Sequence, residues 1–327
     1  MNRHFLIPWL VGLALLRATT AQAYCRTTAC NPAEEVCETD QNGCPVTGKP
    51  LQWPVACVGV ALNEKASVQV NYAEFERVVT ASFNAWNEVR CDGQAPSIAA
   101  TVVGPVACDR VKINKEKGNA NLVVFRDDDW PHTGQSSVLA LTTVQYGTET
   151  GTIYGADMEI RARPGDVRLT TGDEDVDTDL QSIITHEAGH FLGLAHTSVA
   201  EATMLPYYPP KSTKFRSLEA DDRAGLCAAY PPARGGLPAC DPGGPSPLSL
   251  GLSSDCEGER LVLPPVEVGG GCRAVAVGEG MGRGAGVGVV MAVALVARKR
   301  RRSACAGATR RAGTDRRGGA AVLPSAG

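Results

Sequence analysis

Histidine, long apolar runs and excess positive charge are all scarce in this chain of 327 residues. Only five histidines are present, so a site built from imidazoles can draw on very few positions. Residues 298–327 carry nine Arg or Lys and one Asp, so the net charge of −3 leaves −11 on the rest of the chain. An acidic body of this kind argues against nucleic acid as a partner. Cys-x-x-Cys pairs are also absent, which excludes the zinc sites built on them.

The apolar run nearest the N-terminus has the features of an export signal. Phe5 to Leu16 is mostly apolar, follows Arg3, and precedes Ala21-Gln22-Ala23, a small-residue cleavage pattern. The run is too short to span a membrane comfortably. We therefore predict a signal peptide over residues 1–23 and an exported chain that begins near Tyr24.

The twelve cysteines fit an exported chain, because thiols pair in an oxidising compartment. Ten of them lie between residues 24 and 271, an even number that can pair without remainder, although the pairing cannot be deduced. They are Cys25, Cys30, Cys37, Cys44, Cys57, Cys91, Cys108, Cys227, Cys240 and Cys256. We predict that the first four staple residues 24–50 into a Cys-rich loop.

A globular domain is predicted from residue 51 onward, since a hydrophobic content of 43% is enough for a core. Asn71 can cap a helix, with Glu74 three residues later, and a core face follows at helical spacing. That face comprises Phe75, Val79, Phe83 and Trp86. Four β-prone runs are predicted strands: residues 97–103, 122–125, 138–144 and 152–160.

The most informative stretch has the pattern H-E-x-x-H-x-x-G-x-x-H. In a helix, His186 and His190 lie one turn apart on one face, so both imidazoles can reach one metal ion. Glu187 is offset by one residue and can reach a metal-bound water without being a ligand. Gly193 can adopt a positive φ and turn the chain out of the helix, which brings His196 back toward the metal. Three imidazoles and one open position are typical of a catalytic zinc site.

This pattern resembles the metzincin clan of zinc peptidases, and two later stretches narrow the resemblance to its matrixin family. Residues 202–208 are similar to the Met-turn of the clan, and residues 218–230 are similar to the C-terminal helix of matrixins. The matching Met-turn positions are Met204, Pro206 and Tyr208. Leu205 and Thr197 depart from the Tyr and Ser that are usual in the family.

The resemblance implies an α+β fold of the metzincin-like zincin type over residues 51–232. Its twisted mixed sheet and active-site helix would be split by a cleft from a small C-terminal subdomain. It also implies a secreted zinc-dependent endopeptidase, with one zinc held by His186, His190 and His196. The zinc-activated water would attack the peptide bond with Glu187 as general base. The site would be supported by Gly193, Met204, Pro206 and Tyr208.

The strand predicted at residues 138–144 corresponds to the sheet edge that pairs with peptide substrate in matrixin-like folds. An edge strand offers unpaired N–H and C=O groups, so it can bind an extended peptide through backbone hydrogen bonds. We therefore expect a peptide or protein substrate along this strand, and a monomeric enzyme.

The histidine count bears on a second metal ion. A structural zinc site of the matrixin kind takes three His and one Asp, and once His4 leaves with the signal peptide only His132 remains outside the motif. We therefore expect a single zinc, and His132 as a plain loop residue. Matrixin propeptides can also place a thiolate on the zinc, but their Pro-Arg-Cys-Gly type of motif is absent here.

Calcium is left open by the sequence. Acidic clusters at residues 127–129 and 173–179 offer the oxygen ligands that hard cations prefer, although the second cluster departs from the EF-hand pattern. The alternative is a solvated acidic loop that supports a helix N-terminus. In that case Thr178 or Asp179 caps the catalytic helix.

Beyond residue 232 the composition changes. A Gly-Cys pair at 271–272, an apolar run over 284–297 and an arginine cluster from 298 occur in the order of the C-terminal sorting signals of some bacterial surface proteins. We predict, in order, a Gly/Pro-rich linker (233–271), a sorting or membrane segment (272–302) and a low-complexity tail (303–327). The protein would then be secreted or held at the bacterial envelope, with a disordered tail as the alternative.

A rival hypothesis from another functional class is a zinc-containing adhesion or binding module that has lost turnover. The intact Glu187 argues against it, because a catalytically silent descendant has no chemical need for a general base.

Overall fold

A computed structural model describes residues 24–31, 35–113, 119–132, 137–234 and 256. It also describes the backbone of three later strands, β12 (Glu259–Arg260), β13 (Val275–Ala276) and β14 (Gly288–Ala297). The predicted signal peptide and low-complexity tail lie outside the described residues. Within the described part of the chain, no helix is long and apolar enough to cross a membrane.

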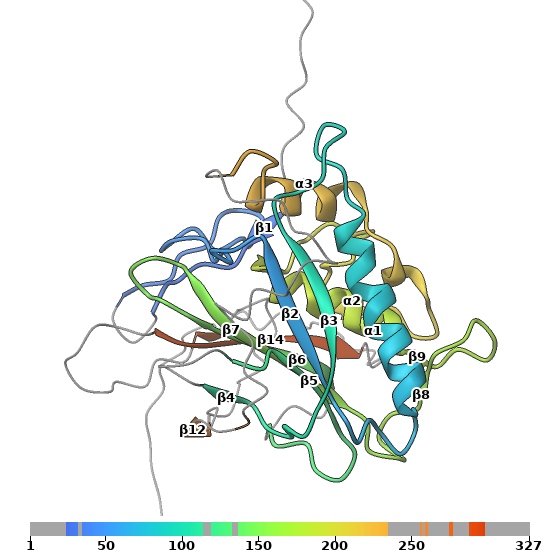
Figure 1. Ribbon diagram of the computed structural model, residues 1–327. Coiled ribbons are helices and arrows are strands. Elements are labelled where there is room, and N and C mark those ends of the chain that lie inside the picture. Colours follow the sequence, from blue (N-terminus) through green and yellow to red (C-terminus); the bar gives the residue numbers. More distant parts are fainter. Residues whose placement is uncertain are drawn as a thin grey trace, which may run out of the picture.

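A twisted mixed sheet forms the body of the fold, with α-helices against it, which confirms the predicted α+β class (Figure 1). Five of its strands run in the order β6-β7-β5-β2-β3. These are β2 (Cys57–Asn63), β3 (Ala99–Val106), β5 (Leu122–Arg126), β6 (Val138–Tyr146) and β7 (Ile153–Arg161). Within this set β6 alone is antiparallel to its neighbour, and the other pairs are parallel. The four predicted strands are therefore confirmed, with ends shifted by a few residues.

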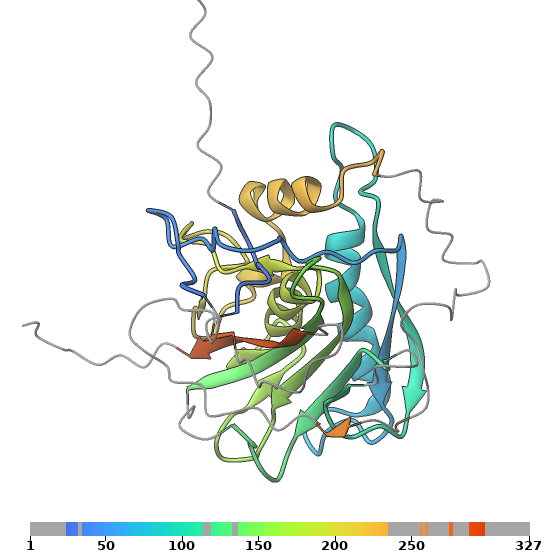
Figure 2. The same cartoon turned by 90° about the vertical axis from the view of Figure 1, so that its left-hand side faces the viewer.

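Two helices, α1 (Tyr72–Asn87) and α2 (Leu180–Phe191), lie side by side on one face of the sheet (Figures 1 and 2). The predicted cap of α1 is present, because the side-chain oxygen of Asn71 accepts a hydrogen bond from the Glu74 amide at 3.0 Å. Its predicted core face is buried, and the Trp86 indole also donates a hydrogen bond to the Thr185 carbonyl of α2. The first helix therefore positions the second, which carries the histidine motif.

The third helix, α3 (Ala220–Ala229), lies apart from this pair and near the N-terminal strand. It confirms a helix in the stretch that is similar to the matrixin C-terminal helix. Shorter elements complete the described chain: β1 (Cys25–Arg26), β4 (Lys112–Ile113), β8 (Leu169–Thr170), β9 (Thr178–Asp179), β10 (Leu194–Ala195), β11 (Tyr207–Tyr208) and the 3-10 helix η1 (Lys214–Arg216).

The N-terminal segment is stapled as predicted, by disulfides Cys25–Cys44 and Cys30–Cys37. All four thiols are therefore used, and none of them is available as a thiolate ligand for a metal. The short strand β1 pairs with β10, directly after the histidine-bearing helix. The stapled segment thus braces the chain at the point where it leaves α2.

Two further disulfides join distant parts of the chain. Cys91, just beyond α1, pairs with Cys227 of α3, and Cys108 pairs with Cys256. Cys57 is disulfide-bonded too. Cys256 falls in the predicted linker, most of which lies outside the described residues, and the nearby strand β12 pairs with β4. This part of the linker is attached to the body of the protein.

The prediction that residues 138–144 form the sheet edge is wrong. The sheet continues past β6 to β14 and then β11, and β14 pairs antiparallel along β6 from Tyr146 to Val138 (Figure 2). The physical reason is that an edge strand carries unpaired backbone N–H and C=O groups, which can form hydrogen bonds with another extended chain. Here that chain comes from about 150 residues further along the same sequence, which local patterns cannot reveal.

The expectation that His132 is a plain loop residue is also wrong. Its Nε2 lies 2.7 Å from Oε2 of Glu159, which also pairs with Arg126, and both His132 and Glu159 are buried. Burial raises the pKa of Glu159, but the pairing with His132 and Arg126 outweighs it and leaves that pKa below its usual value. A buried carboxylate needs such partners, and this need brings the histidine inward.

Candidate active site

Three imidazoles converge at the C-terminal end of α2, those of His186, His190 and His196. Their Nε2 atoms lie 3.1 Å apart for His186–His190 and 3.2 Å apart for the other two pairs. Nitrogens bound at about 2.0–2.1 Å to one tetrahedral zinc lie about 3.3 Å from each other. Within the described residues, this is the one group of three or more His, Cys, Asp or Glu placed to hold a metal ion.

In the two helical histidines, a hydrogen bond at Nδ1 determines which ring nitrogen carries the hydrogen. Nδ1 of His186 lies 2.6 Å from the Thr203 carbonyl oxygen, and Nδ1 of His190 lies 2.9 Å from that of Leu194. A carbonyl can only accept, so each Nδ1 carries the hydrogen and each Nε2 keeps its lone pair. The lone pairs thus point at one another, an arrangement that a cation stabilises. The residues present therefore fit a zinc ion.

Burial also keeps these rings uncharged. Desolvation lowers the pKa of His186 to about 4 and lowers the pKa of His190 and of His196 well below the usual value. The neutral imidazole is the form that binds a metal. All three histidines are therefore in the ligand-competent state at neutral pH.

The turn that delivers His196 depends on Gly193. Its φ is +85°, and a Cβ there would lie 2.6 Å from the Leu51 carbonyl oxygen, so any other residue would be strained and crowded. The Gly193 carbonyl in turn accepts the Thr27 amide at 3.0 Å, next to the β1–β10 pairing. The predicted glycine turn is present, and the N-terminal segment holds it.

The chain that follows the third histidine folds back beneath the rings. The Thr197 amide donates a hydrogen bond to the Met204 carbonyl at 3.0 Å. The Met204 side chain is buried against Gly189 of α2, and a Cβ at position 189 would lie only 2.2 Å from the Met204 Sδ. Asp222 fixes this turn because its carboxylate accepts the amides of Thr203 at 2.8 Å and Met204 at 3.0 Å. The turn is thus held from two sides, by α2 and by α3.

Glu187 is buried beside the histidines. The hydroxyl of Thr142, on β6, donates to Glu187 Oε2 at 2.5 Å. This contact fixes the carboxylate from the sheet side and links α2 to the strand that was expected to meet substrate. The arrangement offers a metal site with a carboxylate next to it.

The chain matches the matrixin peptidase family over residues 60–231, which is more than half of its length. It belongs to the matrixin family. The chain is 27% identical over 190 residues to neutrophil collagenase of Homo sapiens, which covers 57% of this chain and 35% of the collagenase. It is 27% identical over 165 residues to karilysin of Tannerella forsythia, covering 50% and 30% of the two chains. It is 37% identical over 112 residues to stromelysin-3 of Mus musculus, covering 32% and 20%. The chain therefore spans about a third or less of each relative.

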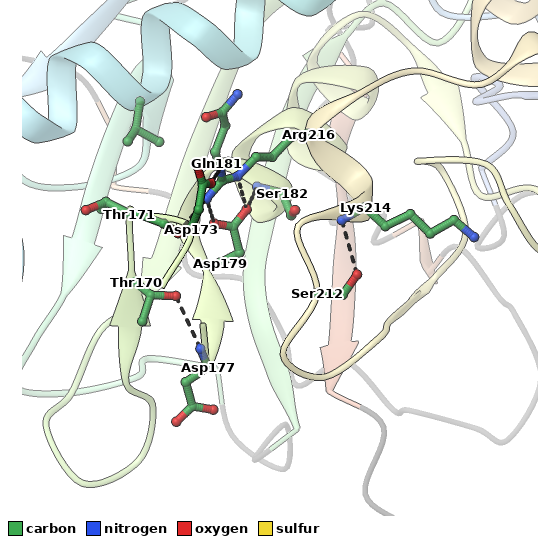
Figure 3. A network of polar contacts seen from close by, with 12 residues as sticks. Thr170, Thr171, Asp173, Asp177, Asp179, Gln181, Ser182, Ser212, Lys214 and Arg216 are labelled. Atoms are coloured by element: carbon green, nitrogen blue, oxygen red, sulfur yellow. Dashed lines mark hydrogen bonds and ion pairs between the residues drawn. The ribbon is translucent and has the colours of Figure 1, made fainter. Parts of the chain in front are cut away.

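The histidine-bearing helix α2 of this matrixin starts on a polar network at its N-terminus (Figure 3). Asp179, one of the two predicted caps, accepts the Ser182 amide at 2.8 Å and is paired with Arg216, whose Nε donates to its Oδ2 at 2.9 Å. The hydrogen bonds to Asp179 raise the pKa of Arg216. Tyr208 joins them, because its hydroxyl accepts the Asp179 amide at 2.9 Å and donates to the Ser212 carbonyl at 2.6 Å.

Most acidic side chains of the loop at residues 173–179 form ion pairs next to this network. Asp173 pairs with Arg216, and Asp175 and Asp177 pair with Arg168. Four carboxylates of the loop therefore face arginines, those of Asp173, Asp175, Asp177 and Asp179, as expected of an acidic loop that supports a helix N-terminus.

Two residues with a place in the site escaped the sequence reasoning. Thr142 gave no local signal, because a threonine in a strand is ordinary. Asp222 lies in the stretch that is similar to the matrixin C-terminal helix, but its hydrogen bonds to the Met-turn were not predicted. A signal did exist, since Glu219 and Asp222 form a capping box at the start of α3.

Proposed function

We propose that this chain is a zinc-dependent endopeptidase in which His186, His190 and His196 hold the metal and Glu187 acts as general base. One observation carries the proposal: three ring nitrogens within 3.2 Å of each other, with a buried carboxylate in the next residue of the helix. Membership of the matrixin family and the names of the relatives, a collagenase and a stromelysin, support the same reaction.

A zinc ion held by the three rings would supply a Lewis acid and would acidify a bound water. The protein's own residues would do the rest. Glu187 would take a proton from the attacking water and pass it to the leaving amine. Thr142 would hold the carboxylate in place, and the carbonyls of Thr203 and Leu194 would orient two of the rings. Gly193, Met204 and Tyr208 would support the site through the turn and the cap described above, and Pro206, which is buried two residues after Met204, would support the same turn.

The proposal includes one zinc and a monomeric enzyme that acts on peptides or proteins outside the cell. The signal peptide, the disulfides and the family support export. The proposal names no calcium site: in the loop at 173–179 four Asp carboxylates pair with Arg168 and Arg216, and in the cluster at 127–129 Asp127 accepts hydrogen bonds from Ser67 and Val68.

The test is hydrolysis of denatured casein by the purified mature chain without its tail, residues 24–271, with and without a zinc chelator. We expect cleavage that the chelator abolishes and added zinc restores, and one zinc per chain by elemental analysis. A chain that holds one zinc and cleaves nothing would instead support the silent binding module. Two tightly bound zincs would contradict the ligand set.

We also propose that residues 272–302 act as a sorting segment at the bacterial envelope, with processing near Cys272. The order of Gly-Cys pair, apolar run and arginine cluster supports this. A Cys272→Ala variant should accumulate with its basic tail attached, as mass spectrometry would show. An intact tail on the wild-type surface protein would contradict the processing step.

A further inference from the structure

The strand β14 lies in the sheet as a peptide substrate would lie on an edge strand. It runs antiparallel to β6 along the whole strand, from the pair Gly288–Tyr146 to the pair Val296–Val138 (Figure 2). The backbone groups of β6 that face away from β7 therefore meet the backbone of β14. This is the pairing by which an exposed sheet edge takes up an extended chain.

On its other side β14 meets the segment that follows the Met-turn. It runs parallel to β11, with Tyr207 opposite Val296 and Tyr208 opposite Ala297. It also contacts α2, the helix that carries the histidines. The segment is thus held by backbone pairing on both sides and lies against the helix of the candidate active site.

The register places a defined part of β14 nearest the general base. Val293 is the Cα partner of Thr142, whose hydroxyl donates to the Glu187 carboxylate. The backbone around Val293 therefore passes a residue of β6 whose hydroxyl is hydrogen-bonded to Glu187. A substrate in this position would present its backbone to the same carboxylate.

We propose that the strand position between β6 and β11 is a site for one extended chain of small apolar residues, and that its resident occupant is the protein's own Gly288–Ala297. This inference rests on the proposed function, because it takes that strand position to be the substrate site. The segment reads Gly-Val-Val-Met-Ala-Val-Ala-Leu-Val-Ala and carries no charge, so no charged group is desolvated when it is covered.

Occupancy by a segment of the same chain has a consequence for added peptides. A tethered segment acts at an effective concentration in the millimolar range, so a free peptide of similar affinity cannot displace it at micromolar concentration. The segment also lies C-terminal to Cys272, so the processing proposed there would remove it. Removal of the tail would then open the site.

The deciding experiment is hydrogen–deuterium exchange on the full mature chain carrying Glu187→Ala, which prevents self-cleavage. Val293→Pro is added to break the pairing, because proline lacks the backbone N–H and is not tolerated inside a sheet. Val293→Thr is the matched control, since it keeps the amide and the β-branched shape. We expect the amides of residues 138–146 that face β14 to exchange at least about tenfold faster in the proline variant and unchanged in the threonine variant, while those that face β7 stay protected in both. Equal exchange in the proline variant and its parent would overturn the inference.

A second measurement uses a labelled peptide with the sequence of residues 288–297 as the probe, added to the same Glu187→Ala chains. It should bind the proline variant at least about tenfold more tightly than the parent, because the competitor has gone. Equal binding to both would count against the inference.

The two proposals fail in different ways. If Val293→Pro exposes β6 but the chain with Glu187 intact never hydrolyses peptide, the proposed function is wrong, and the assignment of residues 288–297 as the occupant of the site is supported. If a chelator abolishes hydrolysis but the β6 amides exchange at equal rates in all variants, the proposed function is supported, and the assignment of residues 288–297 as the occupant is wrong.

Discussion

The proposed metal-binding half of the site and the proposed peptide-pairing half are assembled over very different distances in the sequence. The first comes from one helix and the turn after it, with His186 and His196 ten positions apart. The second brings together β6, β11 and β14, which begin at residues 138, 207 and 288. Helix geometry is enough to build the first, since side chains four residues apart share a face. The second depends on which strand reaches an open sheet edge, and the sequence near β6 does not specify that.

The largest effect should come from the proposed general base, Glu187. Glu187→Ala should lower kcat/KM for a peptide substrate by at least about 10²–10⁴-fold, the usual contribution of general acid–base catalysis. Zinc content should stay at one per chain, because Glu187 lies outside the proposed ligand set of His186, His190 and His196. His196→Ala is the contrasting variant and should lose metal by elemental analysis. Near-normal turnover in Glu187→Ala would refute the assignment of the base.

The next effect should appear where a distant helix holds the Met-turn. Asp222→Ala leaves the buried amides of Thr203 and Met204 without their acceptor, and that of Glu219 at 2.8 Å as well. At about 1–3 kcal/mol for each such group, the free energy of unfolding should fall by about 3 kcal/mol or more. Urea denaturation measures it, with Asp222→Asn as a milder variant that keeps one carbonyl oxygen. A loss below about 1 kcal/mol in the alanine variant would show that the Met-turn keeps its conformation without the hydrogen bonds to Asp222.

A smaller effect should come from the contact between α2 and the Met-turn. A Cβ at position 189 would lie 2.2 Å from the Met204 Sδ and 2.9 Å from Cζ2 of Trp86. Gly189→Ala should therefore destabilise the fold by about 1–3 kcal/mol, as overpacking does, although alanine favours a helix. Gly172→Ala, where no atom lies within 4 Å, is the control and should be close to neutral. Thermal unfolding that ranks the two variants equally would contradict the close packing.

The last effect depends on pH and lies in the sheet. Burial raises the pKa of Asp157 on β7 from 3.8 to about 7, with the Leu122 amide donating to it. Between about pH 4 and pH 7 the folded protein keeps a proton that the unfolded chain has lost, so stability falls as pH rises. The slope is at most about 1.4 kcal/mol per pH unit. Asp157→Asn should lack this pH dependence. Between pH 5 and pH 7 its free energy of unfolding, measured by urea denaturation, should therefore rise relative to that of the wild type. Parallel pH profiles would show that Asp157 is ionised in the fold.

Local patterns in the sequence determined the metal-binding half and most of the element framework. The spacing of His186, His190 and His196, the positive φ of Gly193, the Asp179 cap and the core face of α1 all follow from helix periodicity and backbone sterics. These act within a few residues, so a single sequence is enough to read them.

Only the tertiary structure decided which distant groups became partners. It placed β14 on β6, His132 on Glu159, Thr142 on Glu187 and Asp222 on the Met-turn, and it chose which cysteines pair. A strand edge accepts any extended backbone, a buried carboxylate accepts any donor, and ten thiols can pair in many ways. The choice among such equivalent partners is made by the packing of the whole chain, because the entropy of closing a long loop is repaid only when many contacts form together.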